Sequence, residues 1–335
     1  MASALQRYAY GQARVRARLA GLLTRPQLDA LAGRPDVASL ERELAAAGLE
    51  KPVLAVLAAI RDLEAMLDGP PREVVRAYRG RFECENLKLL LRARERGIAW
   101  AEVEPMLLPV GRLGPGRHAE EVFEAASLAD AVARLESTPF GDALRRQIRA
   151  AGAQSREPER FRLELVAERE AYESIWRAVS ALDAADQRAA IAVVGVELDA
   201  ANLVRTLRMR RAHGLAPEEV LAYAIHGGLH LDARRRALLA HEPVESWASH
   251  LAGTPYAAAL QTTGATPALE HELRRIRARA AERALHGSPF HLGLMLAYLT
   301  LVEVQAADLQ RLLEGARLGR PDTWARTGLV GARGR

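Results

Sequence analysis

One short pattern decides the fold that this sequence predicts: Leu198-Asp199-Ala200-Ala201-Asn202-Leu203, in which an acid is followed three residues later by Asn and then by Leu. The same order of an acid or amide, then Asn or Asp, then Leu occurs twice more, at Phe82-Glu83-Cys84-Glu85-Asn86-Leu87 and at Val304-Gln305-Ala306-Ala307-Asp308-Leu309. The Asn or Asp positions are 116 and 106 residues apart, close to a third of the chain. We therefore interpret the chain as three related units in tandem.

Other landmarks recur with the pattern. A glycine follows each Asn or Asp after 11 or 12 residues, at Gly97, Gly214 and Gly319, where it would end a helix. Pro139-Phe140 and Pro255-Tyr256 stand at similar distances before the second and third copies. The units predicted from these landmarks are residues 1–97, 98–214 and 215–335, and no counterpart is assigned to the tail from 321 to 335.

Apolar residues follow helical spacing through nearly the whole chain. Between Glu159 and Leu182 they recur in steps of three, four or seven, and no convincing alternation of a β-strand occurs. Aromatic residues are few, at 5%, and Ala, Leu, Arg and Glu are abundant, which favours helices over sheets. The sequence therefore predicts an all-α protein.

Composition excludes several classes of protein. Hydrophobic residues make up 49% and charged residues 27%, so the chain is not wholly disordered. Basic residues outnumber acidic residues only slightly, by 47 to 42, so the net charge of +5 does not require a nucleic-acid partner. Cys84 is the only cysteine, which excludes an intrachain disulfide and a cysteine-based zinc site and fits a reducing compartment. The longest uncharged apolar stretch, Leu292 to Val302, is too short to cross a bilayer.

Residues three apart on a helix share a face, so each pattern forms one polar stripe: Glu83 with Asn86, Asp199 with Asn202, and Gln305 with Asp308. Two interpretations are open. Each stripe could bond to a neighbouring helix or loop inside its own bundle, because a buried polar group needs a partner. Alternatively, the three stripes could converge on a shared surface that receives a partner.

Arginines follow each polar stripe near the end of its helix, where cations stabilise the helix dipole. Arg205 and Arg311 lie earlier than that effect explains, which leaves an acidic partner open. Motifs of catalysis are missing: Gly111 to Arg117 lacks the Gly-Lys-Ser/Thr ending of a phosphate loop, and His271-Glu272 lacks the second histidine of a zinc protease helix. We predict no catalytic residue, no cofactor, no metal and no small-molecule substrate.

Taken together, the threefold pattern, the Pro-Phe and Pro-Tyr elements and the opening Tyr8-Ala9-Tyr10-Gly11-Gln12-Ala13-Arg14-Val15-Arg16 resemble the C subunit of prokaryotic V-type (A-type) rotary ATPases, whose eukaryotic counterpart is the d subunit. The resemblance covers essentially the whole chain. It implies a funnel of three similar helical bundles with pseudo-three-fold symmetry. It also implies a non-catalytic rotor subunit, peripheral to the cytoplasmic face of the membrane, that couples the central-shaft subunits to the proteolipid ring during ATP-linked proton or sodium transport.

Under this resemblance the polar stripes become a candidate shaft socket, lined by Glu83, Asn86, Asp199, Asn202, Gln305 and Asp308. Arginines at the helix ends become candidate rim contacts: Arg94, Arg96, Arg210, Arg211, Arg317 and Arg320. The alternative function is a helical scaffold or nucleic-acid-binding repeat protein. The repeats of such proteins are usually about 20–50 residues long, which is shorter than the units predicted here. We therefore expect no nucleic-acid partner.

Overall fold

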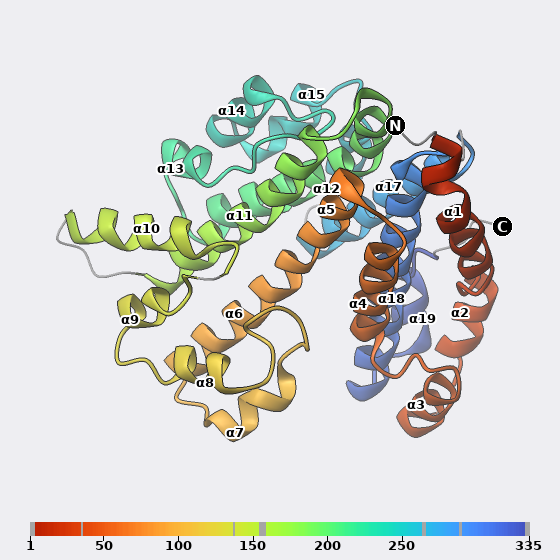
Figure 1. The fold of residues 1–335 in the computed structure, drawn as a ribbon, viewed down its shortest axis with the longest axis horizontal. Coiled ribbons are helices and arrows are strands. Elements are labelled where there is room, and N and C mark those ends of the chain that lie inside the picture. Colours follow the sequence, from red (N-terminus) through yellow and green to blue (C-terminus); the bar gives the residue numbers. More distant parts are fainter. Residues whose placement is uncertain are drawn as a thin grey trace. The chain divides into compact units, whose positions relative to one another are not determined.

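The computed structural model describes residues 4–34, 36–136, 138–153, 159–262, 266–287 and 290–331. Throughout these ranges the chain forms helices joined by short loops and contains no β-strand (Figure 1). The all-α prediction is confirmed. The described residues group into two compact units. The first comprises Met1–Arg72, Ala181–Leu221 and Gly227–Arg335, and the second comprises Glu73–Ser180 and Ala222–His226. The unit boundaries predicted at 97 and 214 stay predictions.

The first unit is built on four long helices, α4 (Pro52–Ala65), α12 (Ala184–Arg211), α17 (Thr266–Leu285) and α18 (Leu292–Arg317). Helix α17 packs against both α12 and α18, and α4 packs against α18. Shorter helices surround them: α1 (Ala4–Ala20), α2 (Arg25–Ala32), α3 (Val37–Ala46), α13 (Pro217–Ala222), α14 (Ala233–His241), η2 (Val244–Ser246), α15 (Trp247–His250), α16 (Tyr256–Thr262) and α19 (Asp322–Thr327).

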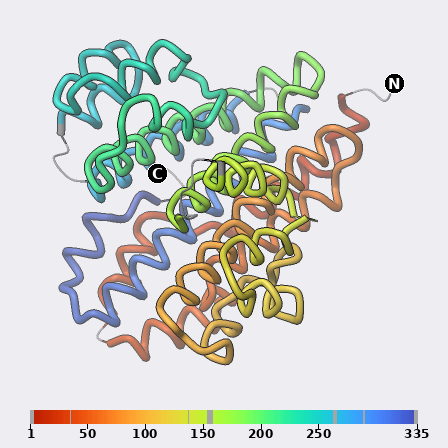
Figure 2. Tube along the Cα trace, turned by 90° about the vertical axis from the view of Figure 1, so that its left-hand side faces the viewer, coloured from red at the N-terminus to blue at the C-terminus, as the bar shows by residue number. Residues whose placement is uncertain are grey.

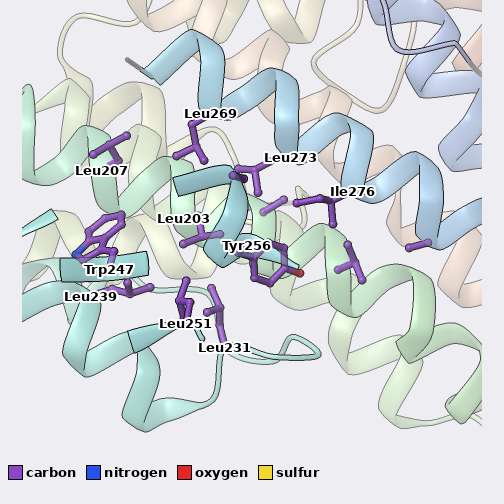
Figure 3. Packing of buried hydrophobic residues seen from close by; sticks show 14 residues of the cluster. Leu203, Leu207, Leu231, Leu239, Trp247, Leu251, Tyr256, Leu269, Leu273 and Ile276 are labelled. Carbon is purple, nitrogen blue, oxygen red and sulfur yellow. The ribbon is translucent and has the colours of Figure 1, made fainter. Parts of the chain in front are cut away.

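Apolar clusters of buried side chains hold these helices together. One cluster joins α12 and α17 to the small helices around Trp247, which is fully buried, and includes Leu203, Leu251 and Tyr256 (Figure 3). Another joins α18 to the first and last segments of the chain through side chains such as Leu28, Leu44, Leu309 and Leu329. Burying each such side chain stabilises the fold by about 1.5–3 kcal/mol. Figure 2 shows the N-terminal and C-terminal segments side by side.

Asp186 fixes the opening segment of the sequence. Its Oδ2 accepts hydrogen bonds from the Tyr8 hydroxyl at 2.5 Å and from Arg7 at 3.2 Å. Its Oδ1 accepts the backbone N–H of Leu292 at 2.9 Å. One buried carboxylate on α12 therefore ties α1 to the N-terminus of α18.

The second unit is built on α6 (Arg79–Glu95) packed against α11 (Arg160–Ser180). Partly buried ion pairs join them, since Lys88 Nζ lies 2.7 Å from Glu168 and Arg92 lies 2.6 Å from Glu164. The smaller helices are α7 (Trp100–Val103), η1 (Glu104–Met106), α8 (Arg117–Phe123), α9 (Leu128–Ala133) and α10 (Gly141–Ala153). Helix α5 (Gly69–Ala77) crosses the boundary between the two units.

The three glycines that follow the repeated pattern end their helices. Gly97, Gly214 and Gly319 have φ of +65°, +60° and +60°, the left-handed conformation that favours glycine. After Gly97 and Gly319 the next N–H returns to the helix, as Ile98 N to Ala93 O at 3.0 Å shows. The predicted helix stops are confirmed.

Helix α18 is long and apolar enough to cross a membrane by length and composition alone, with a mean hydropathy of 1.4 over its most apolar window. Within the described protein, however, 83% of that window is buried against other helices. Its apolar surface is therefore covered by other helices of the fold, namely α4, α12 and α17.

Candidate functional site

The polar stripe on α12 holds a loop. Asp199 is fully buried, and its carboxylate accepts the backbone N–H groups of Leu229 at 3.2 Å, His230 at 2.7 Å and Leu231 at 3.1 Å. The hydroxyl of Tyr256 donates a fourth hydrogen bond, at 3.0 Å. Burial raises the pKa of Asp199 above its ordinary value, although these donors oppose the shift.

Side chains of α14 donate hydrogen bonds to the backbone carbonyl groups of this loop. Arg236 donates to the Gly227 and Leu231 carbonyls, at 3.1 and 2.6 Å, and Arg235 donates to the His230 carbonyl at 2.9 Å. The loop starts with Gly227 and Gly228 at positive φ, which lets its N–H groups turn toward Asp199. Donors and acceptors on both sides leave the loop little freedom to move.

The stripe on α6 holds loops of the second unit in the same way. Glu83 is 5% exposed, and its Oε1 accepts the N–H groups of Arg112 at 2.6 Å and Leu113 at 3.3 Å. The Asn86 amide makes two hydrogen bonds to the backbone of Leu108, each at 2.8 Å, one as donor and one as acceptor. Burial raises the pKa of Glu83.

On α18 the stripe binds segments near the beginning and the end of the described chain. Asp308 is fully buried and accepts the N–H groups of Val330 at 3.0 Å and Gly331 at 2.8 Å. Gln305 accepts the N–H of Leu23 at 2.6 Å. The remaining predicted socket residue, Asn202, is buried as well, with 1% of its surface exposed.

The hydrogen bonds recur at matching sequence distances. Asn86 and Asp308 each bind the residue 22 positions later, and Glu83 and Asp199 each bind a loop that begins 29 or 30 positions later. These bonds join the stripes to backbone, as the first interpretation predicted. The partners of Glu83, Asn86 and Asp199, however, lie beyond Gly97 and Gly214, in the next predicted unit and not in the same bundle. The sequence shows the stripes but not their partners, because backbone N–H groups carry no residue signature.

The structure gives the tail after Pro321 a place that the sequence interpretation missed. Helix α19 begins three residues after Gly319, as α7 and α13 begin three residues after Gly97 and Gly214. Arg311 stacks on Trp324 at 3.8 Å and donates to its carbonyl at 2.8 Å. The spacing from the glycine was the signal that could have found this element. Residues 332–335 lie outside the described part.

The six arginines predicted as rim contacts fall into two groups. Four contact other residues of their own unit: Arg94 the Ser127 carbonyl, Arg210 the Leu239 carbonyl, Arg211 Glu245 and Arg317 Glu41. The other two, Arg96 and Arg320, are exposed at the surface. These four arginines therefore take part in contacts within their own unit. The role of all six as rim contacts stays a prediction.

Comparison with known proteins identifies the family. The sequence model for the ATP synthase (C/AC39) subunit matches residues 12–326. The chain belongs to this family. It is 32% identical over 284 residues, 83% of this chain and 82% of the relative, to the C subunit of the V-type ATP synthase of Thermus thermophilus. It is 25% identical over 332 residues, 92% of this chain and 84% of the relative, to the C subunit of the A-type ATP synthase of Methanothermobacter thermautotrophicus.

Membership of the ATP synthase (C/AC39) family confirms the resemblance found in the sequence. The chain is a non-catalytic, peripheral subunit of a membrane-bound rotary ATPase, and other subunits of that complex are its partners. The alternative of a general helical scaffold or nucleic-acid-binding protein gains no support. Among the described residues no cluster of three or more His, Cys, Asp or Glu side chains could hold a metal ion.

Proposed function

We propose that this C/AC39 subunit is a rotor coupling that joins the central shaft of the ATPase to its membrane proteolipid ring and carries torque for ATP-linked proton or sodium transport. It would sit on the cytoplasmic face of the membrane. The observation that carries the proposal is that a buried acid on each repeated helix binds backbone N–H groups. Glu83 and Asp199 each hold a loop, and Asp308 holds the C-terminal tail. A coupling must resist deformation, and loops held by several buried hydrogen bonds are stiff.

We further propose that the chain consists of three tandem bundles, residues 1–97, 98–214 and 215–335, related by pseudo-three-fold symmetry in a funnel. Two recurrences support the threefold repeat behind this proposal. Each repeated helix ends at a glycine with positive φ, and a short helix starts three residues later. The stripe residues then bind backbone at matching distances of 22 residues in two copies and 29 or 30 in two.

The candidate shaft socket remains part of this proposal. Because its six residues are buried, they would act by positioning the loops that meet the shaft. Asn86→Leu and Asn202→Leu test this role. If the stripes serve the socket, both variants weaken the affinity of the folded protein for the shaft subunits. Unchanged affinity with a reduced melting temperature would restrict the stripes to holding the bundles together.

Affinity purification tests the assembly itself. A tagged copy of the chain, recovered from detergent-solubilised membranes, should bring the shaft subunits and the proteolipid with it. Arg96→Gln and Arg320→Gln, which alter exposed side chains at the predicted rim, should reduce this recovery without changing the stability of the chain. Recovery of the chain with neither shaft subunits nor proteolipid would overturn the proposed coupling.

A further inference from the structure

Helices α17 and α18 run antiparallel in a register that two ion pairs define. Arg274 lies opposite Asp308, with 3.9 Å between Nη1 and Oδ1, and Arg277 lies opposite Glu303, with 2.6 Å between Nη2 and Oε2. Moving three residues back on α17 and three forward on α18 extends this register by about one turn. The next facing pair is therefore His271 and Arg311.

This register gathers three basic side chains on neighbouring turns: His271 and Arg274 from α17 and Arg311 from α18. Asp308 is the acid among them, but its carboxylate is fully buried and already accepts N–H groups from the tail. Two further acids lie nearby, and the charge of Glu314 acts on Arg311. Glu272 pairs with Arg275 at 3.0 Å. Glu314, on the next turn of α18, accepts a hydrogen bond from Gln310 at 3.1 Å.

Neighbouring cations and acids both affect the pKa values of the cluster. Burial and the charge of Arg274 lower the pKa of Arg311, and the charges of Asp308 and Glu314 oppose this shift without cancelling it. Burial and the charge of Arg274 also lower the pKa of His271, with smaller contributions from Arg275 and Arg311. Glu272 acts on His271 in the opposite direction but does not cancel the effect.

Donor groups in the cluster are left for a ligand. The Nδ1 atom of His271 is buried and has no hydrogen-bond partner within the described ranges. Arg311 uses Nε and Nη2 on the carbonyls of Ala325 and Trp324, which leaves Nη1 unassigned. The side chain of Arg274 is 24% exposed, so the cluster can be reached from solvent.

We propose that His271, Arg274 and Arg311 form a binding site for a single oxyanion. The ligand chemistry is that of a carboxylate or a phosphate group, whose oxygens match the planar donor fork of arginine. A bound oxyanion would accept hydrogen bonds from Arg274, from Arg311 and from the buried Nδ1–H of His271. Its source is either an acidic side chain or a free phosphate, and the experiment below separates the two.

The test follows the ring resonances of His271 by NMR in the isolated full-length chain. Sodium phosphate and sodium acetate are added separately, with sodium chloride at equal ionic strength as the reference. The site predicts a saturable shift and a rise in the pKa of His271 with at least one of the two oxyanions. Saturation at lower acetate than phosphate assigns the site to carboxylates, and the reverse order assigns it to phosphate.

Matched variants locate the binding. Arg274→Gln should weaken it about tenfold, because a charge-assisted bidentate contact is lost. Arg279→Gln, which changes an exposed arginine on the same helix, should leave it unchanged. A shift that never saturates, that chloride reproduces, or that survives Arg274→Gln would overturn the site.

A second readout covers the case in which Arg274→Gln does not fold. The oxyanion that saturates should raise the melting temperature of the wild-type chain above that in chloride, since a ligand that binds the folded state stabilises it. His271→Gln should reduce this increase. An equal increase in His271→Gln would overturn the proposal.

Discussion

The hydroxyl of Tyr256 donates a hydrogen bond to the buried carboxylate of Asp199, over 3.0 Å. Asp199 belongs to the repeated pattern on α12, and Tyr256 follows Pro255 at the start of α16, 57 residues later. The repeated pattern and the Pro-Tyr element, which are separate in the sequence, therefore meet in one contact. The same carboxylate holds the loop at Leu229–Leu231, so this contact also fixes the direction of the loop.

Tyr256→Phe removes the donor without changing the shape of the ring. We expect a loss of about 1–2 kcal/mol in the free energy of unfolding, because a buried carboxylate loses one hydrogen bond. Urea denaturation measures the loss. Tyr10→Phe, at a side chain that is 64% exposed, is the control and should change stability by less than about 0.5 kcal/mol. Equal losses in the two variants would contradict a role for the Tyr256–Asp199 bond.

Gly228→Ala tests how closely the loop approaches α12. Gly228 has φ +116°, and a Cβ there would collide with Oδ1 of Asp199. Gly48 also has positive φ, +68°, but has open space around it. Gly48→Ala should therefore cost only about 1–2 kcal/mol of backbone strain, and Gly228→Ala should cost clearly more. Thermal or urea unfolding of the two variants measures both losses of stability. A larger loss in Gly48→Ala than in Gly228→Ala would refute the close contact.

The pKa of Asp199 predicts a pH dependence. Burial raises it in the folded protein, so the folded state binds this proton more tightly than the unfolded state does. The contribution of Asp199 is then most favourable below about pH 4, the ordinary value for Asp, and declines as the pH rises through the folded pKa. Asp199→Asn cannot titrate. Its stability deficit relative to wild type should therefore shrink from about pH 4 to about pH 7. Urea titrations that show a constant or growing deficit would contradict the shift.

Arg311→Gln tests the attachment of the tail. The substitution removes the stacking on Trp324 and the hydrogen bond to its carbonyl, at an expected cost of about 1–2 kcal/mol. Amide hydrogen exchange should accelerate in residues 322–331 first. Arg317→Gln, which removes an exposed ion pair with Glu41, should cost no more than about 0.5 kcal/mol. Unchanged exchange in the tail of Arg311→Gln would show that other contacts hold it.

Local features of the fold could be predicted from the sequence because they depend on residues close in the chain. Helical spacing predicted the helices, and Gly97, Gly214 and Gly319 predicted where three of them end. The packing of α4 against α18 joins segments more than 200 residues apart, and no periodicity encodes it. The acids at 83, 199 and 308 were visible, but their backbone donors were not. The partner of Asp308 is the tail at Val330, a segment to which the sequence pattern assigns no counterpart.

Coupling is tested most directly by comparing ATP hydrolysis with ATP-driven ion uptake in membrane vesicles from cells that lack this chain. A rotor coupling predicts that hydrolysis by the catalytic subunits persists while ion uptake is lost, and that the wild-type chain restores uptake. Uptake that continues at the wild-type ratio to hydrolysis without this chain would contradict the account.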